Sequence, residues 1–296
     1  MLLRVTTYRL LVLLAVFSSA ACLAQAASPS QSASSPDPVQ AATGVMDNSP
    51  CQSVTGGNQQ LTPLAKLCEF ALNYQRELPD FLAEMTITER RPQLTTVVAA
   101  QVTLKQGHES YSAMTVNGKP VEVDSLNKVS KAPMRFTSSG EFGALLVDLF
   151  HPGEAEFQFR KQATLNGTPV VVYDFHVPAS SNKFWSLTDD FGHTLHPELQ
   201  GELWVEAGTG RLMRESLQPV HLPADFEIAG IATTIDYGLT AVGDAGVFVL
   251  PSRSESRICT RQQFSKPVSC VSNVKTFSKY EKFAATTRIL ADGPQQ

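Results

Sequence analysis

The stretch EFQFRKQATLNGTPVVVYDFHV, residues 156–177, decides the fold class of this chain. Two strand-like segments flank Asn166-Gly167, and Asn-Gly is among the strongest signals for a two-residue β-hairpin turn. Asn117-Gly118 and residues 208–210 (GTG) separate two further pairs of strand-like segments. Three hairpins in succession predict an antiparallel meander.

More strand patterns lie on both sides of these hairpins. In residues 81–88 and 100–105, every second residue belongs to one series of side chains expected to face the core. A period of two residues is typical of a half-buried strand. Further strands are expected at 232–237, 247–250, 254–261 and 269–277. The last two of these should pair as a hairpin, so the chain is predicted to be mainly β.

An N-terminal helix is expected before the first strand. Thr62 is a suitable N-cap, Pro63 fits the first helical position, and apolar residues recur at helical spacing until Pro79 stops the run.

A short inner helix is expected to interrupt the strands. Ser138 and Glu141 have the spacing of a capping box, and His151-Pro152-Gly153 ends the segment. Because most of its circumference is apolar, the helix should be covered on two sides. It is either a plug that fills the core or a lid over an apolar pocket. In the second case the residues that line the ligand are Phe142, Leu145, Leu146 and Leu149.

Residues 1–26 have the pattern of a signal peptide. Arg4 and Arg9 precede an apolar run at 10–17, and residues 24–26 (AQA) offer a small-x-small cleavage site. The apolar run is far shorter than the roughly 20 residues that cross a bilayer as a helix, so no transmembrane span is expected. The mature protein is therefore predicted to be periplasmic or extracellular.

The cysteines fit an exported protein. Cys22 occupies the place of the lipidated cysteine of a bacterial lipoprotein, but Ser19 stands where such sequences usually have Leu, so cleavage after Ala26 is favoured. An even number of remaining cysteines in an exported chain predicts disulfides. Among three possible pairings, the nearest-neighbour one is favoured: Cys51 with Cys68 and Cys259 with Cys270.

Composition divides the rest of the chain. Residues 27–48 are rich in Ser, Ala and Pro and are expected to form a disordered tether, residues 49–290 a single β domain, and residues 291–296 a disordered tail. The formal charge of −4 becomes −6 when the two arginines of the signal are removed. An acidic chain without a basic run is not expected to bind nucleic acid.

The chain has no GxSxG, GxGxxG, P-loop or HExxH motif, and neither catalysis nor a cofactor is expected. One cluster of ionisable residues, in a segment expected to be a loop, is a candidate for metal binding. Its members are Asp189, Asp190, His193, His196 and Glu198. His193 and His196 would hold a divalent metal if a carboxylate joined them. Solvated loop residues are the simpler interpretation.

The strand pair GELWVEAGTGRLMRES, residues 201–216, resembles the wall hairpin of the bacterial lipoprotein-carrier superfamily, which includes the periplasmic lipoprotein localisation factors. The resemblance implies a strongly curved antiparallel sheet, like half a barrel, with an N-terminal helix and an inner helix. It also implies binding of acyl chains rather than catalysis, and it transfers no functional residue.

Three functional hypotheses follow. The favoured one is an exported, non-enzymatic protein that binds an apolar or acyl ligand in the cell envelope. The second is an envelope scaffold or protein-interaction domain with a filled core. The third is a metal-dependent enzyme centred on His193 and His196. An empty space of about 300 Å³ or more beneath the inner helix would distinguish the first from the second.

Overall fold

The computed structural model describes residues 51, 58–91, 93–122, 140–151, 153–183, 185–189, 192–262 and 266–283. The expected signal peptide, Cys22, the tether and the C-terminal tail lie outside the described residues, as do Ser138 and Asp190.

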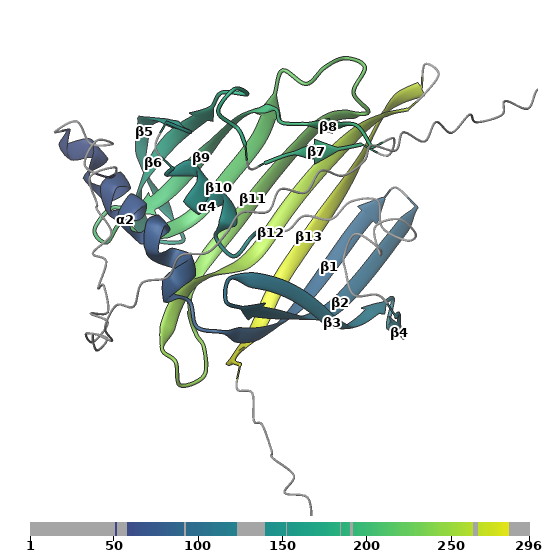
Figure 1. Cartoon of the computed structure of the whole chain (residues 1–296), viewed down its shortest axis with the longest axis horizontal. Coiled ribbons are helices and arrows are strands. Elements are labelled where there is room, and N and C mark those ends of the chain that lie inside the picture. Colours follow the sequence, from purple (N-terminus) through teal and green to yellow (C-terminus); the bar gives the residue numbers. More distant parts are fainter. Residues whose placement is uncertain are drawn as a thin grey trace, which may run out of the picture. The chain divides into compact units, whose positions relative to one another are not determined.

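Most of the described chain belongs to one antiparallel sheet with open edges (Figure 1). Its strands are β1 (Phe81–Arg91), β2 (Leu94–Lys105), β3 (His108–Val116), β4 (Lys119–Pro120), β5 (Glu156–Leu165), β6 (Thr168–Val177), β9 (Glu198–Glu206), β10 (Leu212–Val220), β11 (Ile228–Ala241), β12 (Val247–Gln262) and β13 (Lys266–Lys282). Their order is β4-β3-β2-β1-β13-β12-β11-β10-β9-β6-β5. A separate small sheet pairs β7 (Leu187–Thr188) with β8 (Thr194–Leu195).

The curved, mainly antiparallel sheet confirms the predicted fold class, and the predicted turns connect its strands. Asn117 and Asn166 adopt left-handed backbone angles, with φ of 48° and 50°. Each is followed by a glycine that also has positive φ, as the tight hairpin turn requires. The two strands around residues 208–210 pair as β9 and β10.

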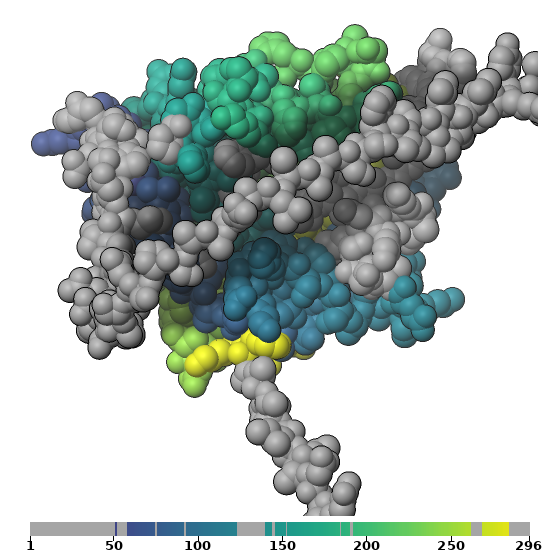
Figure 2. All heavy atoms as spheres, in the orientation of Figure 1, coloured from purple at the N-terminus to yellow at the C-terminus, as the bar shows by residue number. Residues whose placement is uncertain are grey.

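One pairing joins distant parts of the chain. Strand β13 lies beside β12, as the hairpin pattern predicted, and on its other side pairs with β1. The first and last long strands are therefore neighbours inside the sheet. Strands β2, β3 and β4 continue the sheet beyond β1, and β12, β11, β10, β9, β6 and β5 continue it beyond β13. In the space-filling view the blue residues of β1–β3 lie on the opposite side of the molecule from the teal residues of β5 and β6 (Figure 2).

Helices lie against one face of the sheet, which we call the inner face. They are the 3₁₀ turn η1 (Gln59–Leu61), α2 (Thr62–Glu77) and α4 (Ala144–Leu149). The N-cap of α2 is Leu61, so Thr62 is the first helical residue and not the predicted cap. Pro63 lies in the first turn, where its missing N–H costs nothing. Within the described residues, no helix is long and apolar enough to cross a membrane.

Both disulfides join nearest neighbours along the chain. Cys51 is bonded to Cys68 on α2, and Cys259 on β12 is bonded to the residue directly opposite on β13, Cys270. The first bridge fixes the chain that enters α2, and the second joins two strands that already pair. The bridges stabilise the start of the domain and the end of its longest hairpin.

Candidate ligand-binding face and its buried polar centre

The inner helix is shorter than expected and is not held by a capping box. Residues 141–143 form a turn, α4 begins at Ala144, and its N-cap is Gly143, which has no side chain with which to cap it. Glu141 therefore lies outside the helix, and its carboxylate has a different partner, described below. The predicted capping box of Ser138 and Glu141 is wrong in this respect, because the buried lysine under this turn attracts the Glu141 side chain.

Gly143 is required by a close approach to α2. Its φ is 89°, in the left-handed region, and a Cβ at this position would lie 2.1 Å from Cδ1 of Tyr74. The Tyr74 hydroxyl donates to the carbonyl of Val249 at 2.7 Å, which fixes the ring in place. Segment 140–150, which we call the plug, is thus held between α2 and the sheet.

The structure divides the predicted lining residues between two apolar clusters. Phe142 packs edge-to-face against Phe81 and Phe277, with ring centroids 5.3 and 5.1 Å apart. Leu146 and Leu149 instead join the cluster formed by α2 and the β6–β10 part of the sheet. The side chain of Leu145 is outside the described ones.

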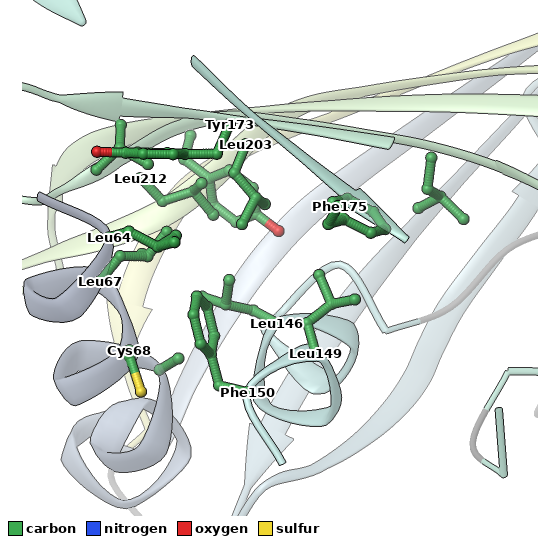
Figure 3. Packing of buried hydrophobic residues seen from close by; sticks show 14 of the residues in the cluster. Leu64, Leu67, Cys68, Leu146, Leu149, Phe150, Tyr173, Phe175, Leu203 and Leu212 are labelled. Atoms are coloured by element: carbon green, nitrogen blue, oxygen red, sulfur yellow. The ribbon is translucent and has the colours of Figure 1, made fainter. Parts of the chain in front are cut away.

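Three sets of side chains converge on the second cluster (Figure 3). Those of α2 are Leu64, Leu67 and Cys68, those of the plug are Leu146, Leu149 and Phe150, and those of the sheet include Tyr173, Phe175, Leu203 and Leu212. Phe150 also stacks on Phe157 of β5, with ring centroids 4.9 Å apart. The plug therefore covers an apolar area of the inner face.

The plug leaves little room beside its own side chains. Phe142, Leu146 and Leu149 are only 3%, 1% and 2% exposed. These three side chains therefore contact protein atoms on almost all sides, as the filled-core hypothesis expects, and a ligand could bind against this part of the sheet only by displacing the plug.

Between the two apolar clusters lies a group of buried polar residues. Lys275 of β13 donates from Nζ to Oε1 of Glu141 at 2.5 Å, and both side chains are 3% exposed. The hydroxyl of Tyr237 on β11 donates to the backbone carbonyl of Glu141 at 3.3 Å. The plug is thus anchored to the middle of the sheet by a buried ion pair and a backbone hydrogen bond.

A second acid anchors the same turn. Glu109 of β3 accepts from the hydroxyl of Tyr111 at 2.7 Å and from the backbone of Gly140. Burial, with the negative charge of Glu141 nearby, raises the pKa of Glu109, while Lys275 acts in the opposite direction. Burial also raises the pKa of Tyr111, so this phenol remains a hydrogen-bond donor.

Glu215 of β10 is the most isolated of these acids. Its side chain is fully buried, Oε2 lies 3.3 Å from the Tyr237 hydroxyl, which shares its one proton between this oxygen and the Glu141 carbonyl, and Oε1 has no hydrogen-bond partner among the described residues. Burial raises the pKa of this carboxyl to about 7. The inner face thus contains an acid whose charge changes near neutral pH.

The sequence interpretation missed Lys275, Glu215 and Glu109. A signal for the first was present, because Lys275 lies two residues from Asn273 and Phe277 and so shares their face of β13. A lysine in register with inward residues indicates a buried ion pair. The identity of its partner depended on a contact between positions 134 residues apart, which no local pattern contains.

The candidate metal loop is stabilised by hydrogen bonds of its own. Asp189 accepts from the backbone N–H of His193 at 2.8 Å and contacts Nδ1 of the same residue at 2.9 Å, which closes the β7–β8 turn. The His193 ring is 74% exposed, and His196 is also exposed. No group of three His, Cys, Asp or Glu side chains within the described residues is arranged to hold a metal ion.

Glu198 lies at the start of β9 and contacts different histidines. Its two carboxylate oxygens lie 2.8 Å from Nε2 of His176 and 3.0 Å from Nδ1 of His221. These hydrogen bonds, from His176 first, lower the pKa of Glu198. The four ionisable residues of the predicted loop that the structure describes therefore do not form a single site.

The chain matches no known protein-family model and no curated protein sequence. Several solved structures are similar to it. A LolA superfamily protein from Nitrosomonas europaea has 12% sequence identity and a TM-score of 0.34, over 74% of this chain and 93% of the other. A DUF1329 family protein from Desulfovibrio piger has 12% identity and a TM-score of 0.39, over 76% and 95%.

Lipoprotein LppX from Mycobacterium tuberculosis has 12% identity and a TM-score of 0.28, over 76% of this chain and 97% of the other. The first of these three structures carries the name of the superfamily that residues 201–216 resemble. With TM-scores below 0.5, these likenesses establish no ligand or activity for the chain.

Proposed function

We propose that this chain is an exported, non-enzymatic protein that binds an apolar or acyl ligand on the inner face of its sheet, where the plug lies. The observation that carries the proposal is the plug itself. Its Leu146, Leu149 and Phe150 cover apolar residues of the sheet that would otherwise face solvent. A ligand that supplies equivalent apolar contact could take the same place.

The plug is suited to displacement because it has little stability of its own. Its helix has six residues, and helices of this length do not form in water without tertiary contacts. Its N-cap is Gly143, which has no side chain, so no N-cap side chain accepts a hydrogen bond from the first N–H groups of the helix. The apolar contacts of the plug and its ion pair with Lys275 are contacts that a ligand with an apolar chain and an anionic group could replace.

Two features support export. The described residues contain two disulfides, which persist in oxidising compartments and are rare in the cytosol. The signal-like residues 1–26 agree with this interpretation. We therefore place the protein in the periplasm or outside the cell, with residues 27–48 as a tether.

Native mass spectrometry with lipid extraction tests the proposal, on protein purified from an exporting host with its disulfides intact. We expect a co-purifying or added acyl ligand to bind. The variant Leu203→Glu places a charge in the sheet's part of the apolar cluster and should abolish binding, whereas Leu149→Ala removes plug contacts that compete with the ligand and should strengthen it. The matched control is Leu239→Glu, because Leu239 is 58% exposed on the β11–β12 hairpin. A folded protein that binds no lipid would favour the envelope scaffold with a filled core.

A further inference from the structure

The plug presents a carboxylate followed by apolar side chains. A fatty acid presents the same two kinds of group, a carboxylate and an apolar chain. Glu141 presents its carboxylate to Lys275, and the residues that follow place Phe142, Leu146 and Leu149 in apolar surroundings. Both parts of the segment are almost fully buried. The inner face thus already contacts one carboxylate and several apolar side chains, all of which belong to the plug.

We infer that the ligand of the inner face is a single-chain amphiphile with a singly charged anionic head, and that Lys275 binds this head in place of Glu141. This inference rests on the proposed function and names the class of its ligand. Displacement of the plug would separate the Glu141 carboxylate from Lys275 and would also expose the apolar residues of the sheet that the plug covers. An acyl carboxylate replaces both contacts at once.

Charge favours this class over a neutral ligand. A buried ammonium that loses a directly bonded carboxylate is destabilised, because the low-dielectric surroundings solvate it poorly. A long-chain alcohol would offer the apolar contacts but no negative charge to Lys275. The carboxylate should therefore bind more tightly than the alcohol of the same chain length.

The surrounding groups limit the charge of the head. Glu109 lies within electrostatic range of this site, since the charge of Glu141 raises its pKa and the charge of Lys275 lowers it. A second negative charge on the ligand would be repelled by Glu109. The ring of Phe277 lies 6.0 Å from the Lys275 Nζ and occupies another side of the ammonium. A monoanion such as a carboxylate fits these neighbours better than a dianionic phosphate.

Two probes of equal chain length test the inference, dodecanoate and 1-dodecanol. Their dissociation constants are measured by isothermal titration calorimetry at pH 8 on the exported, disulfide-bonded protein. We expect dodecanoate to bind about tenfold more tightly, the ratio of a charge-assisted hydrogen bond to a neutral one. Monododecyl phosphate, as a third probe, should bind less tightly than dodecanoate.

Variants of Glu141 and Lys275 test whether the preference for dodecanoate over dodecanol arises at this ion pair. Glu141→Gln removes the internal competitor and should strengthen the binding of both probes, with dodecanoate still the tighter ligand because only it supplies an anion to Lys275. The double variant Glu141→Gln with Lys275→Met replaces the ion pair by neutral side chains and should bind both probes equally. Lys279→Met is the matched control, because it removes a lysine from the exposed face of the same strand. It should retain the wild-type ratio.

The outcomes separate this inference from the proposed function. Equal affinity of the wild-type protein for dodecanoate and dodecanol overturns the anionic head and leaves apolar binding in place. Failure of the folded wild type and Glu141→Gln to bind either probe overturns both. Near-ultraviolet circular dichroism checks that each variant is folded. If the double variant does not fold, Lys275→Arg takes its place and must retain the preference for dodecanoate.

Discussion

Replacement of Glu215 by Gln should make the protein more stable at pH 8 and leave its stability nearly unchanged at pH 5. The Glu215 carboxyl is fully buried, lies 3.3 Å from the Tyr237 hydroxyl and has no partner at Oε1 among the described residues. Burial raises its pKa from 4.5 to about 7 in the folded protein. A neutral amide of the same shape avoids the cost of ionising this group.

The sign and the magnitude follow from the two pKa values. The folded state holds the Glu215 proton more tightly than the unfolded state, so stability is lost as pH rises from the unfolded pKa through the folded one. At 1.36 kcal/mol per pH unit, the step from 4.5 to about 7 corresponds to about 3 kcal/mol. About 2.5 kcal/mol of this develops between pH 5 and pH 8.

Urea unfolding of both proteins at pH 5 and pH 8 measures the effect. The pKa values of Asp148 and Glu109 are also raised by burial, but these groups titrate in both proteins and cancel in the comparison. The free energy of unfolding of Glu215→Gln should exceed that of the wild type by about 2.5 kcal/mol more at pH 8 than at pH 5. An equal difference at the two pH values would refute the reasoning.

Three further changes should separate buried from exposed contacts. Gly143→Ala forces a Cβ into the ring of Tyr74 at an unfavourable φ and should cost about 3 kcal/mol in thermal or urea unfolding, whereas Gly107→Ala, with open space around it, should cost less. Cys259→Ser opens the 11-residue loop of the second disulfide and should cost about 3 kcal/mol relative to the oxidised wild type, and full reduction of the wild type, which also opens Cys51–Cys68, should cost more. Arg160→Ala removes an exposed ion-pair network with Asp174 and Glu202 and should leave the urea unfolding midpoint almost unchanged.

Local features of the fold could be predicted, because turn chemistry and side-chain alternation are properties of neighbouring residues. Asn117 and Asn166 have the left-handed backbone that their dipeptides predicted, and β12 pairs with β13 as expected. The pairing of β1 with β13 could not be predicted, since it joins residues nearly 200 positions apart. Alternation assigns a face to each strand but does not choose its neighbour.

The site was predicted only in its apolar part. Helical spacing identified Leu146 and Leu149 as residues that face a core, since burial of an apolar stripe repeats with the helix period. It also extended the helix back to Phe142, which the structure places in a turn. The departure has a physical reason, because Glu141 pairs with Lys275 and its carbonyl accepts from Tyr237, contacts that a helical turn at this position would have to give up.

The buried ion pair under the plug is difficult to explain as a source of stability. Replacing such a pair by apolar side chains of similar volume is often neutral or stabilising, while removal of one partner costs about 3–5 kcal/mol. The ion pair therefore adds little net stability to the fold, but loss of the Glu141 carboxylate from Lys275 would be costly. An apolar plug on an apolar surface would release for any apolar molecule. A plug anchored through Lys275 should release most readily for a molecule that supplies a negative charge together with an apolar chain.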